Sequence, residues 1–242
     1  HIETPVGKLF DHVADVRPGM AGTVKKAYNR PIEGKPDTWL PWDESNGGYW
    51  AGGKHWSEVV ADDAETFIKQ AAAEQKPFFM YLAFNAAHTP MEASEKYLAR
   101  FPNIANPQRR TYAAMMSAMD DAIGRTLAAL RDQKLEEKTL VIFLNDNGGP
   151  TMPTTTVNGS SNNPLRGSKR QTWEGGIRVA LAMSWKGHLD AGRVDDRPII
   201  QLDVLPTALA AAGVATRASE FDGVNLLPFL SGTAKGVPHD TL

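Results

Sequence analysis

Cysteine is absent from the 242 residues, which excludes disulfides, cysteine-ligated zinc and a cysteine nucleophile within this chain. Neither sign of charge dominates, because 26 Lys and Arg stand against 28 Asp and Glu, for a formal net charge of −2. This balance favours neither a nucleic-acid partner nor an anionic membrane surface. The longest weakly polar run, residues 204–215, is shorter than the about 20 apolar residues that a membrane span requires. We therefore expect no membrane span.

The alternation of helical and extended apolar patterns predicts the fold class. Hydrophobic residues make up 42% of the chain and charged residues 22%, which suits a packed core. Apolar residues at helical spacing predict helices at 58–74, 107–132 and 200–212, the last with a kink at Pro206. Short apolar runs predict buried strands at 78–84 and 139–144, and a further strand is predicted at 177–185. This order predicts an α/β fold with a mostly parallel central sheet flanked by helices.

Composition divides the chain near residue 56. Residues 1–56 are rich in Trp, Pro and Gly and poorly periodic, so we expect an irregular segment packed on the core. Residues 57–242 are expected to form the α/β domain. Within it, residues 150–176 are predicted to form a long polar loop. Loops longer than about 12 to 15 residues are usually functional or disordered.

Two polar loops follow predicted buried strands. His88 comes after the strand at 78–84, and Asp146 and Asn147 come directly after the strand at 139–144. Because ligands of such sheets bind at the carboxyl ends of the strands, these side chains are candidates for one site. A carboxylate beside an amide oxygen suits a hard cation such as calcium or magnesium, although the same residues also form ordinary turns. A single loop histidine is more often structural or merely exposed than functional.

A basic cluster lies in the long polar loop. Residues 165–170 contain three cations, Arg166, Lys169 and Arg170. Such a cluster can bind an oxyanion, and the alternative is a solvated basic loop. Residues 174–178 then lead the chain into the strand predicted at 177–185.

Taken together, these motifs have a defined order. They are His88-Thr89-Pro90, Asp146-Asn147-Gly148-Gly149, Leu165-Arg166-Gly167-Ser168-Lys169 and Glu174-Gly175-Gly176-Ile177-Arg178. The set closely resembles the formylglycine-dependent sulfatases, which belong to the alkaline phosphatase superfamily. The runs at 78–82, 201–207 and 222–228 resemble the same family, so the resemblance extends over about residues 57–231. It implies an incomplete alkaline-phosphatase-like core, in which residues 57–242 are the C-terminal part of the catalytic domain.

The resemblance also implies roles for four side chains. Asp146 and Asn147 would be calcium ligands, with magnesium less expected. His88 would hydrogen-bond or protonate the sulfate-ester region, and Lys169 would bind a sulfate oxygen. The implied activity is arylsulfatase-like hydrolysis of a sulfate ester, on a sulfated small molecule or a sulfated glycan. The family also suggests a periplasmic or secreted location.

Three features of the family pattern are missing. The formylglycine precursor lies in a Cys/Ser-x-Pro-x-Arg motif, and this sequence contains no such motif. The family's Asp-Asp pair in its first strand is also missing, because the pairs at 62–63 and 195–196 are in the wrong places. A small C-terminal subdomain expected after about residue 240 is likewise missing. We therefore expect an internal fragment that is inactive alone and whose parent supplies formylglycine from the missing upstream part.

Two other functions fit the same residues. The first is a phosphatase or phosphonate hydrolase on the same scaffold, which would bind a different oxyanion. The second is a noncatalytic, degenerate module, which the missing nucleophile favours for the chain by itself.

Overall fold

The computed structural model describes residues 31–32, 35–39, 50–51, 54–89, 91–153 and 157–240. These residues form two compact units. Unit 1 contains the described residues up to Gln133 together with Gly149–Gly176, and unit 2 contains Lys134–Gly148 and the described residues from Ile177 onward. The chain therefore passes from one unit to the other three times.

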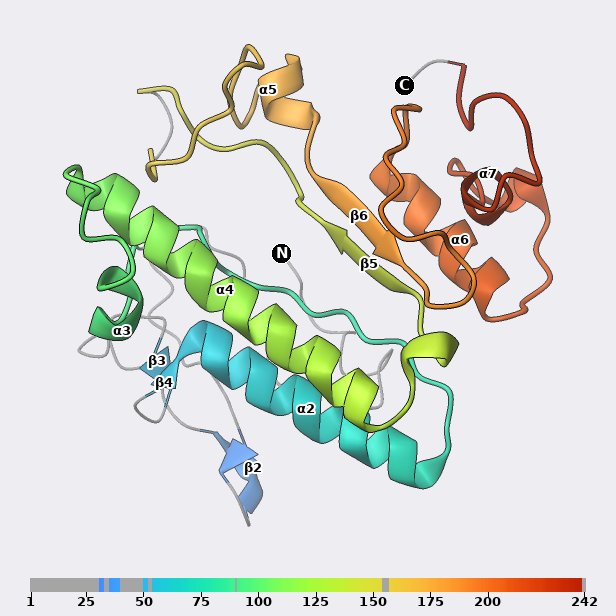
Figure 1. Ribbon diagram of the computed structural model, residues 1–242, viewed down its shortest axis with the longest axis horizontal. Coiled ribbons are helices and arrows are strands. Elements are labelled where there is room, and N and C mark those ends of the chain that lie inside the picture. The colour runs from blue at the N-terminus through green and yellow to red at the C-terminus, as the bar shows by residue number, and fades with distance from the viewer. Residues whose placement is uncertain are drawn as a thin grey trace. The chain divides into compact units, whose positions relative to one another are not determined.

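Two long helices form the centre of unit 1. α2 (Trp56–Glu74) and α4 (Pro107–Asp132) lie side by side (Figure 1). They confirm the helices predicted at 58–74 and 107–132. α4 begins where Asn106 accepts a hydrogen bond from Arg109 N at 2.9 Å, with a proline in the first turn, where its missing N–H removes no helical bond.

The helix pair is packed through small side chains and tied by one arginine. Buried residues of the two helices include Ala64 and Ala118, and small side chains allow two helices to approach closely. Arg125 of α4 donates to Asp62 at 2.6 Å and to Glu65 at 2.7 Å, both on α2. These bonds fix the two helices against each other at their polar edge.

A short helix and two strand pairs complete the regular structure of unit 1. α3 (Glu95–Leu98) packs on α4 through Tyr97, which is buried beside two alanines of α4. The strands pair antiparallel, β1 (Pro31–Ile32) with β2 (Lys35–Trp39) and β3 (Trp50–Ala51) with β4 (Lys54–His55). Most of residues 1–56 lies outside the described residues, so the expected packing of that segment on the core stays a prediction.

Unit 2 contains one strand pair and several short helices. β5 (Val141–Leu144) pairs with β6 (Leu181–Ser184). The short helices are η2 (Glu136–Lys138), η3 (Gln201–Asp203), α6 (Val204–Ala211), η4 (Ala218–Glu220) and α7 (Leu227–Leu230). One more short helix, α5 (Glu174–Ile177), begins in unit 1 and ends in unit 2 (Figure 1).

The helix predicted at 200–212 is confirmed as η3 followed by α6. Pro206 is the third residue of α6. The N–H groups of the first helical turn have no partner within the helix, so a proline there removes no helical hydrogen bond. The kink at Pro206 stays a prediction.

The strand arrangement differs from the expectation in two ways. Val141 pairs with Ser184 and Leu144 with Leu181, so β5 and β6 are antiparallel, as are the other strand pairs among the described residues. An apolar run indicates which residues are extended and buried, but it does not encode the direction of the neighbouring strand.

The segment at 78–84 also differs from the expectation, because it does not form a strand. Phe79 is 60% exposed and Tyr81 is 80% exposed, so the segment is not buried on both faces. A strand requires hydrogen-bonded neighbours, and none of the strands in the described part of the chain pairs with this segment. None of the described helices is long and apolar enough to cross a membrane.

Candidate functional site

His88 lies in a tight turn of unit 1. Its backbone N–H donates to Asn85 O at 2.7 Å, which closes the turn after the extended segment. Its ring atom Nδ1 lies 2.8 Å from Thr89 O. A carbonyl oxygen can only accept a hydrogen bond, so Nδ1 carries the proton and Nε2 is the acceptor nitrogen of the neutral ring. The turn therefore fixes both the orientation and the tautomer of the imidazole.

Lys169 reaches this imidazole from a distant part of the sequence. Its Nζ lies 3.4 Å from His88 Nε2, although the residues are 81 positions apart. The lysine is half-buried and the histidine is exposed. An ammonium group and an imidazole at this separation can both donate to one small oxyanion when the imidazole is protonated. The structure thus brings together two of the four predicted site residues.

The loop that carries Lys169 is held by hydrogen bonds of two polar side chains. Ser168 is fully buried, and its hydroxyl accepts a hydrogen bond from Thr151 N at 2.9 Å. Asn162 accepts from Gly149 N at 2.8 Å, and its amide nitrogen donates to Gly149 O at 2.8 Å and to Gly167 O at 3.0 Å. These bonds connect the two ends of the loop, so the lysine backbone is fixed before any ligand binds.

Arg166 of the same loop has a different environment from Lys169. Its guanidinium lies 4.0 Å from the centre of the Trp173 ring, in a cation–π contact. Gly167 between them has φ +110°, and an added Cβ would lie 2.5 Å from Trp173 Cβ. The arginine therefore contributes to the packing of the loop through Trp173.

The Asp146–Asn147 turn is in unit 2, directly after β5. Asp146 Oδ1 accepts from Asn147 N at 2.9 Å, and the Asn147 amide nitrogen donates to Gly148 O at 2.9 Å. The side chain of Gln201, at the start of η3, donates to Asn145 O and to Asp146 O, each at 2.9 Å. One side chain thereby holds the backbone carbonyls of Asn145 and Asp146, where the chain enters the turn.

The donor atoms of this turn fit a hard cation. Within the part of the chain that the structure describes, Asp146 Oδ2 and Asn147 Oδ1 accept no hydrogen bond. Calcium takes about 6 to 8 oxygen ligands, so these atoms could supply two of them. The described residues contain no group of three or more His, Cys, Asp or Glu that could hold a metal ion. The turn is therefore suited to be a part of a calcium site and not a complete one.

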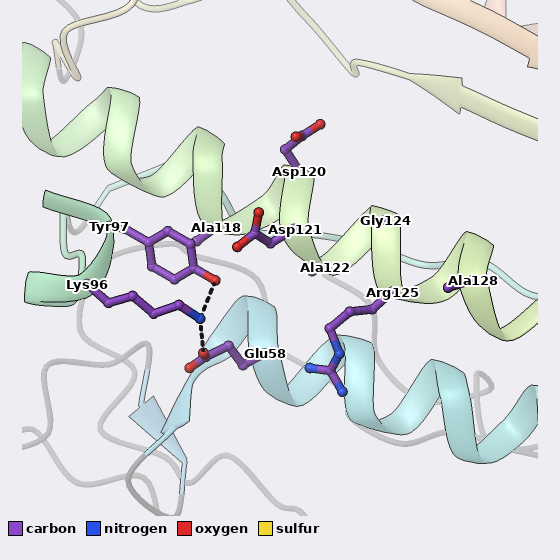
Figure 2. A pocket seen from close by; sticks show the side chains of 10 residues that line it. All are labelled: Glu58, Lys96, Tyr97, Ala118, Asp120, Asp121, Ala122, Gly124, Arg125 and Ala128. Carbon is purple, nitrogen blue, oxygen red and sulfur yellow. Dashed lines mark hydrogen bonds and ion pairs between the residues drawn. The ribbon is translucent and has the colours of Figure 1, made fainter. Parts of the chain in front are cut away.

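A cavity of about 450 Å³ lies elsewhere in unit 1, among α2, α3 and α4 (Figure 2). Its lining charges are largely paired with each other or with neighbours. Lys96 lies 3.6 Å from Glu58 and donates to the Tyr97 hydroxyl at 3.3 Å, while Arg100 binds Asp121 at 2.8 Å. This pairing suits a structural cavity better than a ligand site.

The four predicted residues thus form two pairs, His88 with Lys169 and Asp146 with Asn147. The convergence of both pairs on one space stays a prediction. Sequence reasoning missed the polar residues that hold them, namely Asn158, Asn162, Ser168 and Gln201. The density of Asn and Ser in the loop at 150–176 was the available signal, but it does not say which members are buried.

Comparison with known proteins gives consistent matches. The sequence model of the family described as Sulfatase matches residues 8–214. N-acetylgalactosamine-6-sulfatase of Canis lupus familiaris is 34% identical over 177 residues, which cover 73% of this chain and 33% of that protein. The uncharacterized sulfatase YdeN of Escherichia coli (strain K12) is 33% identical over 189 residues, covering 77% and 33% of the two proteins. The crystal structure of Ps i-CgsB is similar over 76% of this chain and 40% of the Ps i-CgsB chain, with a TM-score of 0.69 and 36% sequence identity.

These matches also confirm the fold class. The matching structures have the alkaline-phosphatase-like α/β fold, and this chain corresponds to a part of it. The chain spans about a third of the length of the curated relatives it matches, 33% in both cases above. The family model covers well over half of the sequence, and the relatives agree with it. The chain therefore belongs to the sulfatase family.

Proposed function

We propose that the protein to which this chain belongs hydrolyses sulfate monoesters, and that His88 and Lys169 contact the ester group. The observation that carries this proposal is the 3.4 Å approach of Lys169 Nζ to His88 Nε2. It brings two hydrogen-bonding groups to one exposed point of a chain whose relatives are sulfatases. We also propose that residues 57–242 are the C-terminal part of the catalytic domain.

The two side chains have complementary chemistry. Cleavage of a sulfate ester develops negative charge on the nonbridging oxygens and on the leaving oxygen. The Lys169 ammonium can stabilise charge on a nonbridging oxygen. His88 Nδ1 is engaged with Thr89 O, so Nε2 is the nitrogen that can donate to the leaving oxygen when the imidazole is protonated. The positions of both groups are set by the protein before the substrate binds.

We propose that Asp146 and Asn147 are two ligands of a calcium ion. When bound, such an ion would polarise a sulfate oxygen as a Lewis acid. Two oxygens out of about 6 to 8 leave most positions to water, so we expect this chain alone to bind calcium weakly. Magnesium is less suited, because it needs a tighter octahedral shell and gives up its waters reluctantly.

The nucleophile is the part of the mechanism that these residues do not provide. Sulfatases of this family generally use formylglycine, but the 242 residues contain no Cys and no Ser-x-Pro-x-Arg sequence. We propose that it comes from sequence outside these residues. The chain by itself then lacks a positioned attacking group and the proximity contribution of about 7 to 11 kcal/mol that such a group supplies.

We propose a sulfated glycan as the substrate class, with a sulfated small molecule as the alternative. Two names support the glycan: the relative called N-acetylgalactosamine-6-sulfatase, and a solved neighbour in complex with k-i-k-neocarrahexaose. That neighbour covers 76% of this chain at 36% identity.

The test compares the 242-residue chain with the full-length gene product, each with calcium and 4-nitrophenyl sulfate. We expect turnover only by the longer protein, and a fall of about a hundred- to a thousandfold in its kcat for Lys169→Ala. Lys69→Ala, at an exposed position of α2, is the matched control and should leave kcat unchanged.

Three results would contradict the proposal. Turnover by the short chain that Lys169→Ala abolishes would show that a nucleophile has been overlooked. Preference for 4-nitrophenyl phosphate would favour the phosphatase alternative. Binding of sulfate without turnover by the longer protein would favour a noncatalytic module.

A further inference from the structure

We infer that Asn158 is a positioning residue that holds the His88 turn in register with the Lys169 loop; the inference rests on the proposed function. Asn158 is buried, with 6% of its surface exposed. Its amide nitrogen donates to Ala87 O at 2.7 Å, across 71 positions of sequence. Its amide oxygen accepts from Ser160 N at 3.1 Å, within its own loop. One side chain therefore joins the loop at 157–168 to the residue before His88.

The backbone around Asn158 is fixed from the other side by the first turn of α4. Gln108 donates to Val157 O at 2.6 Å, and Arg109 donates to Gly159 O at 2.7 Å. Both neighbours of Asn158 are thus bound to a 26-residue helix. Because the backbone on both sides of Asn158 is bound to α4, the hydrogen bond from the Asn158 amide to Ala87 O can hold the His88 turn in one position.

The position of the imidazole depends on this bond. Ala87 immediately precedes His88, so a displacement of the Ala87 carbonyl moves the ring relative to Lys169 Nζ. The lysine is held independently by Lys169 N donating to Gly149 O at 3.2 Å. Misplacement of a catalytic group by about 1 Å can lower the rate about a hundredfold. Loss of the Asn158 bond should therefore affect the chemical step more than substrate binding.

Asn158→Asp separates the two bonds of the side chain. It keeps an oxygen for Ser160 N and nearly the same size, but it places an oxygen where Ala87 O needs a donor. Asn163→Asp is the matched control, since it makes the same charge change at an exposed position of the same loop. In the full-length protein we expect Asn158→Asp to lower kcat for 4-nitrophenyl sulfate about a hundredfold, with a small change in KM. The control should keep both constants.

A second variant and a second measurement keep the inference falsifiable. Melting temperatures show whether Asn158→Asp is folded. Where it is not, Gln108→Ala loosens the support at an exposed helix position and should also lower kcat more than it changes KM. NMR of the full-length protein with labelled His and Lys reports the proximity of the His88 ring and the Lys169 side chain without substrate. We expect their NOE in wild type and in Asn163→Asp, and its loss in Asn158→Asp.

The two readouts separate the two proposals. If the NOE behaves as expected but sulfate esters are never hydrolysed, the proposed function is wrong and the positioning role stands. If Asn158→Asp folds and keeps both the NOE and kcat, the positioning role is overturned. If Asn158→Asp does not fold, the same result in Gln108→Ala overturns the positioning role. A fall in melting temperature with kcat and the NOE retained would show that Asn158 is merely structural, which also overturns it.

Discussion

His239 Nε2 lies 2.8 Å from Asp203 Oδ1 and 2.9 Å from Asp203 Oδ2, although the residues are 36 positions apart. Asp203 is fully buried. It also accepts from Ile200 N at 2.9 Å and from Val224 N at 2.8 Å. A single carboxylate therefore joins the start of α6, the segment before α7 and the end of the described chain within unit 2.

The first prediction is that Asp203→Ala destabilises the protein by about 2 to 6 kcal/mol, because each of two backbone N–H groups left without its acceptor costs about 1 to 3 kcal/mol. The substitution removes the acceptor of two backbone N–H groups and leaves the imidazole without its partner. Urea unfolding measures the change. Asp190→Ala, at an exposed aspartate of the same unit, should change the free energy of unfolding by less than about 0.5 kcal/mol. Equal stability of the two variants would contradict the assignment of Asp203 as the central acceptor.

The second prediction concerns acid stability. Hydrogen bonds from Arg197 lower the pKa of Asp195 from 3.8 to about 2, and the charge of Arg193 adds to the effect. Because the pKa is lower in the folded state, the resulting stabilisation is fully present above the ordinary value. It is lost as the pH falls from about 4 through about 2.

Asp195→Asn checks this directly by chemical denaturation at several pH values. The variant should be less stable than wild type at pH 5, and the difference should shrink as the pH approaches 2. Asp196→Asn, at the adjacent exposed position, should follow wild type throughout. A constant difference at all pH values would show that Asp195 acts through packing and not through its charge.

The third prediction uses two glycines with opposite surroundings. An added Cβ at Gly124, inside α4, would meet no atom within 4 Å, so Gly124→Ala should stabilise the protein by about 0.5 to 1 kcal/mol. An added Cβ at Gly176 would lie 2.6 Å from the Ser168 carbonyl oxygen, so Gly176→Ala should destabilise by about 1 to 3 kcal/mol. Thermal unfolding of the two variants should therefore shift in opposite directions. A shift of the same sign would mean that the contacts around Gly176 are not as close as described.

The fourth prediction is that Gln201 supports the calcium affinity of the Asp146–Asn147 turn. Gln201→Met removes both hydrogen bonds to the turn carbonyls without adding a charge. Loss of a partner that orients metal ligands typically lowers affinity about 10- to 100-fold, and calcium titration by calorimetry measures it in the full-length protein. Gln70→Met, on the exposed face of α2, should bind calcium as wild type does. An unchanged affinity in Gln201→Met would show that the turn holds its shape alone.

Much of the local structure could be predicted from the sequence. The helix at 107–132 was predicted to its observed ends, because its apolar residues recur at helical spacing over its whole length. The state of the segment at 78–84 could not be predicted, because an apolar pattern does not specify the neighbouring strands that would pair with the segment and cover it. Strand direction in unit 2 was missed for the same reason.

Some residues of the candidate site could likewise be predicted from the sequence, and others could not. His88 and Lys169 could be named because their types and motif order carry chemistry, and the structure brings them together. Asn158 and Gln201 could not, because each acts by donating to a backbone carbonyl. Every residue has such a carbonyl, so no side-chain pattern identifies the partner 71 or 56 positions away.

The three crossings of the chain between the units have a consequence for how the protein can be made and dissected. During synthesis, unit 1 lacks Lys169 and the polar residues that hold it until the ribosome has also produced residues 134–148, which belong to the other unit. The first strand of unit 2 must likewise wait for its partner, β6, about 40 residues later. No single cleavage site separates the units, so neither can be expressed as one uninterrupted stretch of the gene. A split-protein design would need a rearranged order of segments.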